Sequence, residues 1–395
     1  MKNNSPTLFV EINASKFIFF VNDEEDYDYK LLYHYTTPIQ GIDNYKIFDH
    51  DLILNIFKKN ILAAEKKLNL IFKEAVIVLN NLDCSTISFS GFKKLNRSQL
   101  LKENITYLLN SLKSKIQETE DKKKIIHIFN SNFFLDEKVL DNLPVGLFGN
   151  IYSHELSFFL INNNDYNNLE KILNKCNLRL KKILSKNFIE GVNIINENPN
   201  LNTFIQVKVN KKNSQIVYFE NSALKYTQDF KFGSDLVLND ISKVVGLKIE
   251  DIKNILQDSN FNNFDNESLL EKKFFQDQSF RKIKKSHIID IAEARIQEIA
   301  DIILFKNINL KSFLKQTVPI FLKLNDKINT KNFKNSYNQS FSYKENYKLI
   351  FLENFKPETF YVNLNKVVQY GWNKEAIPVA QENKTIISKI FDFFN

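Results

Sequence analysis

The amino-acid sequence predicts an α/β protein made of two similar halves, with a small subdomain inserted into the first half. Two observations carry this prediction. A pair of apolar strands followed by an amphipathic helix and further strand occurs twice, starting at Leu8 and again at Thr203. In addition, a strand, a helix and at least two more strands are predicted over residues 85–162, within the first repeat. A duplicated α/β core with one insert is therefore the expected architecture.

In the first half, the segments TLFVEI and KFIFFV are typical of two strands joined by a tight turn. Residues 51–72 carry apolar side chains at spacings of three and four, which predicts a helix with one buried face. Residues 74–80 form a short apolar strand. Residues 165–184 are predicted to form a second helix.

The insert begins with the strand STISFSG and continues with a helix whose apolar residues run from Leu101 to Ile116. The segments KIIHIFNSNFFLD and ELSFFLIN predict the two strands that follow, with a tight turn at LPVGLFGN between them.

The second half begins after the polar segment INENPNLN, residues 195–202. Its first strand, TFIQVKVN, places Ile205, Val207 and Val209 on one face. Residues 243–304 are predicted to be mostly helical, whereas residues 329–340 are polar and are predicted to form a surface loop.

These patterns divide the chain into six parts. The expected domains are a first half (residues 1–84 and 163–199), an inserted subdomain (85–162), a second half (200–375) containing a helical subdomain (243–310), a linker (376–383) and a final amphipathic helix (384–395).

Composition excludes several classes of protein. The net charge of +8, from 54 basic and 46 acidic residues, is small for 395 residues and gives no indication of nucleic-acid binding. The two cysteines, Cys84 and Cys176, are far apart and predict reduced thiols, and the five histidines lack metal-ligand spacing. We also expect neither a signal peptide nor a membrane-spanning segment. Eight glycines, about 2% of the chain against a usual value of about 7%, limit any site that needs a glycine-rich loop.

The last segment, KTIISKIFDFFN, has a two-sided pattern. At about 100° per residue, its six large apolar residues fall within an arc of roughly 160° on one face of a helix. A short helix of this kind, with lysines at its margins, is typical of interfacial membrane binding, and the alternative is a helix docked on its own domain. The residues predicted to contact the membrane are Lys384, Ile386, Ile387, Lys389, Ile390, Phe391, Phe393 and Phe394.

Four motifs, in this order along the chain, resemble those of one family. They are FVEINASKFIFFV, LPVGLFGN, the stretch SALKYTQDFKFGSDLVLNDISKVVG, and EARIQEI. Their order and spacing resemble the actin and sugar-kinase superfamily, and within it the FtsA family of bacterial division proteins. The resemblance covers nearly the whole chain. It implies an actin-like (ribonuclease H-like) duplicated fold that binds ATP and Mg²⁺ between two hairpins, a strand–helix–strand–strand insert and a C-terminal membrane helix.

The sequence departs from this family at the two phosphate hairpins. In the first hairpin, Glu11 replaces an aspartate and Asn13 replaces a glycine, while Ser15 and Lys16 remain compatible with phosphate contact. In the second hairpin, Lys208 replaces an aspartate. Three family glycines are replaced there by Asn210, Lys211 and Lys212.

Two interpretations of these lysines are open. Either Lys16, Lys208, Lys211 and Lys212 still hold a polyphosphate by charge, or the cleft is vestigial and the lysines are solvated. We favour the second interpretation, because side chains where glycines once allowed close approach obstruct the phosphates. We therefore expect no cofactor and no ATP hydrolysis, although the resemblance implies ATP and Mg²⁺.

The resemblance also implies a partner. FtsA proteins bind the acidic, apolar C-terminal peptide of FtsZ on the helical subdomain of the second half, which corresponds to RKIKKSHIIDIAEARIQEI here. In this segment an apolar stripe from Ile288 to Ile303 is predicted to face inward. Arg281, Lys285 and Arg295 are the predicted peptide contacts, and a solvated basic face is the alternative.

The hypothesis from the sequence is thus an adaptor resembling FtsA. It would recruit FtsZ filaments, self-associate into polymers and attach to the cytoplasmic face of the inner membrane at the division site, without binding nucleic acid. Two alternatives remain: a PilM-like pilus-assembly adaptor, which is not expected to end in such a helix, and an actin-fold ATPase or kinase.

Overall fold

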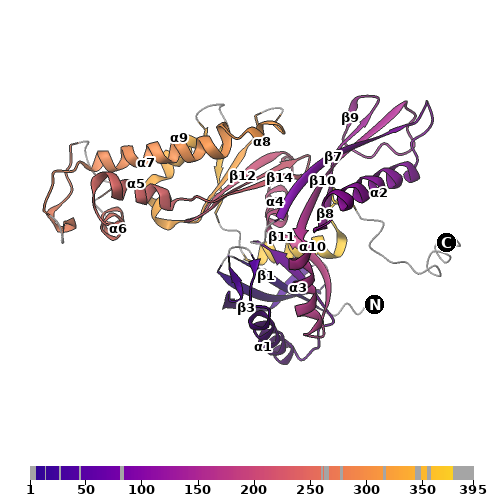
Figure 1. Cartoon of the computed structure of the whole chain (residues 1–395), viewed down its shortest axis with the longest axis horizontal. Helices are drawn as coiled ribbons and strands as arrows, with labels where there is room; N and C mark the ends of the chain where they lie inside the picture. The colour runs from indigo at the N-terminus through magenta and orange to yellow at the C-terminus, as the bar shows by residue number, and fades with distance from the viewer. Residues whose placement is uncertain are drawn as a thin grey trace. The chain divides into compact units, whose positions relative to one another are not determined.

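The computed structural model describes residues 6–13, 15–25, 28–43, 46–80, 84–258, 261, 267–275, 279–314, 317–342, 348–353 and 357–376 (Figure 1). The chain divides into two compact units. Unit 1 comprises residues 1–202, 220–225 and 355–395, and unit 2 comprises residues 203–219 and 226–354. Each unit contains a five-stranded mixed sheet with helices, so the predicted duplicated α/β architecture is confirmed.

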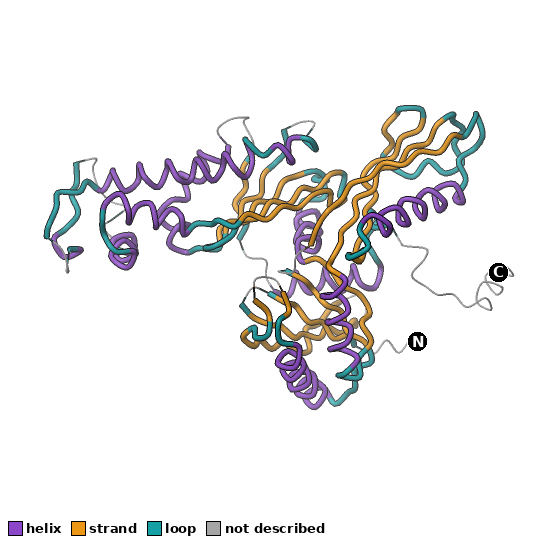
Figure 2. The backbone as a smooth tube through the Cα atoms, in the orientation of Figure 1, coloured by secondary structure: helices purple, strands orange, loops and turns teal. Residues whose placement is uncertain are grey.

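The sheet of unit 1 has the order β11-β6-β1-β2-β3. Figure 2 shows the strands of the chain in orange and the helices in purple. Strands β1 and β2, and β2 and β3, are antiparallel, whereas β6 runs parallel to both β1 and β11. Apolar alternation buries one set of side chains against α1 and α3, while Phe20 on the other face stacks on Tyr361 of α10. The elements are β1 (Thr7–Ile12), β2 (Lys16–Glu25), β3 (Asp28–Pro38), β4 (Ile42–Asp43), β5 (Lys46–Ile47), α1 (His50–Leu68), β6 (Glu74–Leu79), α3 (Asn163–Asn174), β11 (Arg179–Ser185), α4 (Lys186–Glu197) and α10 (Pro357–Tyr370).

Two expectations for unit 1 are wrong. The helix predicted over residues 165–184 ends at Asn174, and Arg179–Ser185 is instead strand β11, which pairs with β6. Asn177, at a φ of 59°, reverses the chain between them. The second half was expected to extend to residue 375, but α10 lies in unit 1, where it contacts α4 and β3.

The predicted insert, residues 85–162, forms a separate four-stranded antiparallel sheet in unit 1, with the order β7-β10-β8-β9. Helix α2 covers one face of this sheet, where Leu108 lies so close to Gly91 that a Cβ atom there would be 2.7 Å from it. The elements are β7 (Cys84–Lys94), α2 (Lys102–Thr119), β8 (Lys123–Leu135), β9 (Lys138–Leu140) and β10 (Ile151–Asn162).

The other face of this sheet holds a buried polar cluster. Residues 220–225, the turn of the β13–β14 hairpin, belong to unit 1. The Lys225 ammonium, 2% exposed, lies 2.8 Å from Glu155 and 3.4 Å from Glu220. The Asn132 amide donates to both carboxylates. The buried charge of Lys225 is thus balanced by two carboxylates, which are themselves hydrogen-bonded to Asn132.

The segment after α10 adds to the edge of β8. Backbone bonds join Asn130 N–H to Lys374 and Ala376 N–H to Ile128. Ala376 is buried, so the first residue of the predicted linker is part of the fold, while residues 377–383 lie outside the described residues.

Glu375 fixes this added segment. Its carboxylate accepts from His127 Nδ1 at 2.7 Å and pairs with Lys182 Nζ at 2.9 Å. The Ser185 N–H donates to His127 Nε2, so the proton of this imidazole is on Nδ1. Burial alone would raise the pKa of Glu375, but the His127 hydrogen bond and the Lys182 charge lower that pKa to about 2.

The sheet of unit 2 has the order β14-β13-β12-β15-β16. As predicted, Ile205, Val207 and Val209 lie together in the core, packed against the helices. The elements are β12 (Phe204–Val209), β13 (Ser214–Glu220), β14 (Ala223–Phe230), α5 (Asp235–Val245), α6 (Ile249–Gln257), a 3₁₀ turn (Lys272–Phe274), α7 (Lys285–Ala300), a π-helical turn (Asp301–Phe305), α8 (Ile308–Lys311), β15 (Ile320–Leu324), α9 (Lys327–Ser342) and β16 (Leu349–Phe351).

The predicted surface loop at residues 329–340 is wrong. This segment lies within helix α9, which packs on α7. Phe333, at a kink within α9, is fully buried, as are Tyr337 and Phe341, whose spacing of four places them on one helical face. Asparagine, lysine and serine around this stripe hid the periodicity.

Glu375→Gln should lower the free energy of unfolding by about 1.5–3 kcal/mol, because it removes a charge-assisted hydrogen bond in a buried site. Urea denaturation measures this change. Glu118→Gln, which removes an exposed pair with Lys115, is the matched control and should change stability by less than about 1 kcal/mol. An equal effect of the two substitutions would contradict the assigned role of Glu375.

The same site predicts a pH dependence. Burial lowers the pKa of His127 from 6.5, and the pKa of Glu375 falls from 4.5 to about 2. Because both pKa values are lower in the folded protein, the unfolded chain binds more protons in acid. The stability from this site is therefore complete above pH 6.5 and decreases as the pH falls, through His127 first and then through Glu375 between pH 4.5 and about 2. In Glu375→Gln the pH dependence between pH 4.5 and about 2 should be lost, whereas the His127 contribution should remain, because the Glu375 hydrogen bond and charge raise the pKa of His127 in the wild type.

Candidate functional site

The first predicted phosphate hairpin is the β1–β2 turn. Asn13 N–H donates to the Lys16 carbonyl at 3.0 Å and closes it. Ser15 and Lys16 are exposed, whereas Glu11, at the end of β1, is 2% exposed. Of the four predicted residues, Ser15 and Lys16 are therefore exposed to solvent. The other two contact each other, since the Asn13 amide donates a hydrogen bond to the Glu11 carboxylate at 3.3 Å.

Lys186, a residue that the sequence did not indicate, is the partner of Glu11. Its Nζ lies 2.6 Å from Glu11 Oε1. Burial lowers the pKa of Lys186, but the negative charges of Glu11 and Glu190 outweigh burial and leave that pKa raised. Lys186 is therefore charged at neutral pH. A metal ion at Glu11 would have to displace this ammonium.

The second predicted hairpin joins β12 and β13 in unit 2, and its asparagines hold it closed. Asn210 N–H donates to the Asn213 carbonyl at 2.9 Å, and the Asn210 amide donates to the Asn213 amide oxygen at 2.8 Å. Asn325, next to β15, donates to the Asn210 side chain at 2.6 Å. The groups of Asn210 that could contact an anion are thus used within the protein.

The start of α5 packs tightly on this turn. Ser234 N–H and Asp235 N–H donate to the carbonyls of Asn210 and Lys211, both at 2.9 Å. A Cβ atom at Gly233 would lie 2.1 Å from the Asn210 oxygen, so glycine is required for this approach.

The predicted lysines of this hairpin are not equivalent. Lys208 is only 6% exposed, in register with Lys323 of β15, whereas Lys211 and Lys212 are exposed at the turn. Lys208 therefore places a basic side chain where the family resemblance implies a metal-positioning acid. Within the described residues, no group of three or more His, Cys, Asp or Glu side chains is arranged to hold a metal ion.

The predicted inward stripe of α7 is confirmed, since the residues from Ile288 to Ile303 that were assigned to it are buried. The three predicted peptide contacts lie in different surroundings. Exposed Arg281 donates to the Gly246 carbonyl at 2.9 Å. Lys285 is 8% exposed, and Arg295 forms ion pairs with Asp240 of α5 and with Glu298. Arg295 thus links α7 to α5. Arg281 links the segment before α7 to Gly246, the residue that ends α5.

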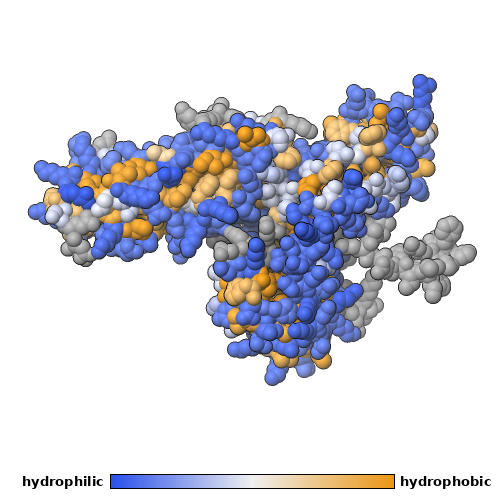
Figure 3. Space-filling view, in the orientation of Figure 1, coloured by the Kyte–Doolittle hydropathy of each residue, from blue (hydrophilic) through white to orange (hydrophobic). Residues whose placement is uncertain are grey.

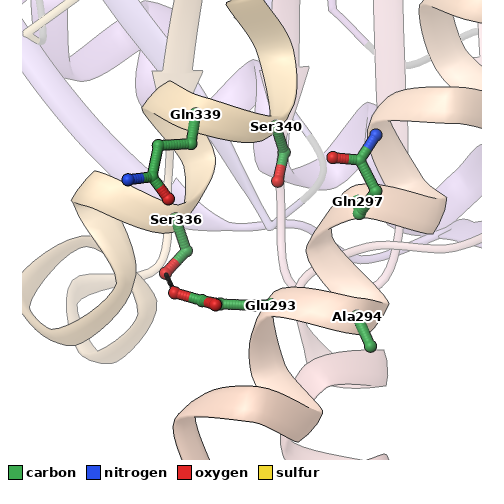
Figure 4. A pocket seen from close by; sticks show the side chains of 6 residues that line it. All are labelled: Glu293, Ala294, Gln297, Ser336, Gln339 and Ser340. Carbon is green, nitrogen blue, oxygen red and sulfur yellow. Dashed lines mark hydrogen bonds between the residues drawn. The ribbon is translucent and has the colours of Figure 1, made fainter. Parts of the chain in front are cut away.

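A small polar pocket lies between α7 and α9 (Figure 4). Ser336 on α9 donates to Glu293 on α7 at 3.2 Å across it. Outside the pocket, apolar residues are visible over the helices of unit 2 (Figure 3). Exposed apolar residues of unit 2 include Ile302 and Ile308, at 40% and 82% exposure. The pocket is lined by Glu293, Ala294, Gln297, Ser336, Gln339 and Ser340.

The predicted membrane residues, from Lys384 to Phe394, lie outside the described residues. Among the helices that the structure describes, none is long and apolar enough to cross a membrane.

No protein-family model matches the chain. Curated proteins with similar sequences include the cell division protein FtsA of Buchnera aphidicola (subsp. Acyrthosiphon pisum), 19% identical over 255 residues, which is 64% of this chain and 60% of that protein. FtsA of Escherichia coli K12 is 17% identical over 218 residues, covering 55% of this chain and 51% of the relative. The chain thus spans less than two thirds of these relatives.

Among solved structures, a chain of the PilM–PilN type IV pilus biogenesis complex superposes with a TM-score of 0.52 at 10% sequence identity. The superposition covers 92% of this chain and 96% of that chain. This likeness shows the fold, whereas the sequence relatives are FtsA proteins. The chain is a divergent, FtsA-like protein with an α/β actin-like fold.

Proposed function

We propose that this protein is an adaptor of cell division that attaches FtsZ-type filaments to the cytoplasmic face of the inner membrane. The observation that carries the proposal is the sequence similarity to FtsA over 255 residues, in a chain whose fold is actin-like. Self-association into polymers is part of the proposal, because many weak membrane contacts act together when they are linked.

The adaptor is proposed to act without nucleotide. The Glu11 carboxylate is paired with Lys186, and the β12–β13 hairpin is closed by its own asparagines, which supports this part of the proposal. Lys208 would oppose a metal ion there by its charge. Without a metal ion bridging the phosphates, ATP hydrolysis lacks the main group that neutralises the developing charge.

Attachment to the membrane is assigned to residues 384–395. Their six apolar residues on one helical face and two lysines fit an anionic lipid surface. Binding of FtsZ is assigned to α7 and the segments on either side of it, from Arg281 to the exposed Ile302. The positive charge of Arg281 suits an acidic peptide, and Arg295 would exchange part of its pairing with Asp240 and Glu298 for the peptide.

A PilM-like adaptor is the second candidate, because a PilM–PilN complex has a similar fold. The amphipathic pattern of residues 384–395 favours the FtsA-like function, since PilM-like proteins are not expected to carry it. An actin-fold kinase or ATPase is disfavoured by Lys208 and the Glu11–Lys186 pair.

Removing residues 382–395 should leave a folded protein that no longer sediments with anionic liposomes. Phe391→Glu should weaken sedimentation as well, because it places a charge on the apolar face. Ser388→Glu, on the polar face, is the matched control and should have a small effect. Sedimentation that persists after the deletion would show that this segment is not the anchor.

The acidic C-terminal peptide of FtsZ should bind the full chain, with an affinity that falls as salt increases. Arg281→Ala should weaken binding about tenfold, equivalent to about 1.4 kcal/mol. Fluorescence anisotropy of a labelled peptide measures both effects, and Lys115→Ala on α2 is the control. If the wild-type chain does not bind the peptide, the proposed partner is wrong.

Titration of the wild-type chain with Mg²⁺–ATP in a calorimeter should give no heat of binding in the micromolar range. A micromolar affinity that Lys16→Ala abolishes would contradict the proposed loss of the nucleotide site and would favour a polyphosphate held by the lysines.

A further inference from the structure

The Glu11–Lys186 pair is enclosed by three elements of unit 1. Glu11 stands at the end of β1, Lys186 is the first residue of α4, and Phe360 of α10 places its ring 5.5 Å from Lys186 Nζ. The Lys186 side chain is 18% exposed and the Glu11 side chain 2%. An ammonium over an aromatic face is attracted by the ring, and more strongly when water is excluded.

A second carboxylate belongs to the same group. Glu190 follows Lys186 by four residues on α4, so both side chains lie on one helical face, and Glu190 is 3% exposed. The group therefore consists of two buried acids and one cation. The Asn13 amide donates to Glu11 at 3.3 Å and is itself held by Asn80 at 3.2 Å.

Such an arrangement requires a positive charge. Two buried carboxylates lose the hydration that stabilises them in water, and a cation close to both keeps them charged. Oxygen ligands of this type are the ones that Mg²⁺ and Ca²⁺ prefer. A lysine ammonium is also a compact point charge that approaches a carboxylate oxygen closely.

We infer that Lys186 takes the place of a divalent cation in unit 1. The positive charge beside Glu11 and Glu190 is supplied by the chain itself, through Lys186. These two acids are therefore balanced without a metal ion or a nucleotide. Removing the Lys186 charge should convert Glu11 and Glu190 into a site for a divalent cation. This inference rests on the proposed loss of nucleotide binding and names the residue that makes the metal unnecessary.

Thermal unfolding of the full chain tests the inference, in millimolar MgCl₂ or CaCl₂ against NaCl of equal ionic strength. The wild-type midpoint should be the same in all three salts. Lys186→Met, which keeps the length of the side chain and removes its charge, should unfold at a lower temperature in NaCl. Its midpoint should rise saturably with either divalent cation. Lys186→Arg keeps the charge and should show no response to metal.

The double variant Glu11→Gln, Lys186→Met is the second arm. It removes one of the two negative charges together with the lysine, so it should fold in NaCl and respond little to metal. If Lys186→Met alone does not fold in NaCl, recovery of folding with a divalent cation or with Glu11→Gln supports the inference. Failure of both to restore it would overturn the inference.

The inference would also be overturned if folded Lys186→Met showed no response to divalent cations, or if Mg²⁺ stabilised the wild-type chain as much as this variant. Binding of Mg²⁺–ATP by the wild-type chain would instead refute the proposed loss of nucleotide binding. The two failures are therefore distinguishable.

Discussion

The scarcity of glycine constrains how this chain turns, and the arrangement of its candidate site depends on that constraint. Left-handed backbone conformations are found at eight non-glycine residues in the described part of the chain, and four of them are asparagines. Asparagine tolerates this conformation because its short amide side chain bonds to nearby backbone. Asn69 ends α1 in this way, and Asn221 with Ser222 makes the two-residue turn of the β13–β14 hairpin. Asparagine thus occupies several left-handed turn positions that glycine commonly occupies in other proteins.

The use of asparagine in place of glycine also has a chemical consequence at the two predicted phosphate hairpins. A glycine leaves its backbone N–H open to a ligand, whereas an asparagine brings a donor and an acceptor of its own. In the β12–β13 hairpin these groups bind one another and Asn325, so the turn is stabilised by its side chains. Acids that are buried or partly buried follow a parallel rule, since Glu11, Glu155 and Glu375 are each paired with a lysine of the same unit. The fold balances these charges internally.

The sequence predicted the elements whose periodicity is strong. The β1–β2 hairpin, α1, the alternation of β12 and the buried face of α7 were found because apolar residues recur with one clear period. Helix α9 was missed because its large buried residues stand among polar neighbours. The helix predicted over residues 165–184 was too long because Leu180, Ile183 and Leu184 of β11 also recur at spacings of three and four.

The candidate site was predictable only in part. The resemblance located Glu11, Asn13 and the second hairpin, since these follow recognisable strands. It could not locate Lys186, which is 175 residues from Glu11 in the sequence and begins a helix that was not predicted. Likewise, nothing in the sequence indicates that Arg295 binds Asp240 or that Asn210 binds Asn325. Side-chain pairing between distant segments depends on the tertiary fold, which local periodicity does not contain.

The bridge that residues 374–376 make with β8 gives the molecule a defined point of mechanical loading. A load applied at Ala376 acts on the two backbone hydrogen bonds that join this segment to β8. Strand bonds pulled lengthwise share the load, and the Glu375 contacts to His127 and Lys182 lie beside them. Because Glu375 bonds to His127 of the insert and to Lys182 of β11, a load on residues 374–376 would reach both sheets of unit 1 together.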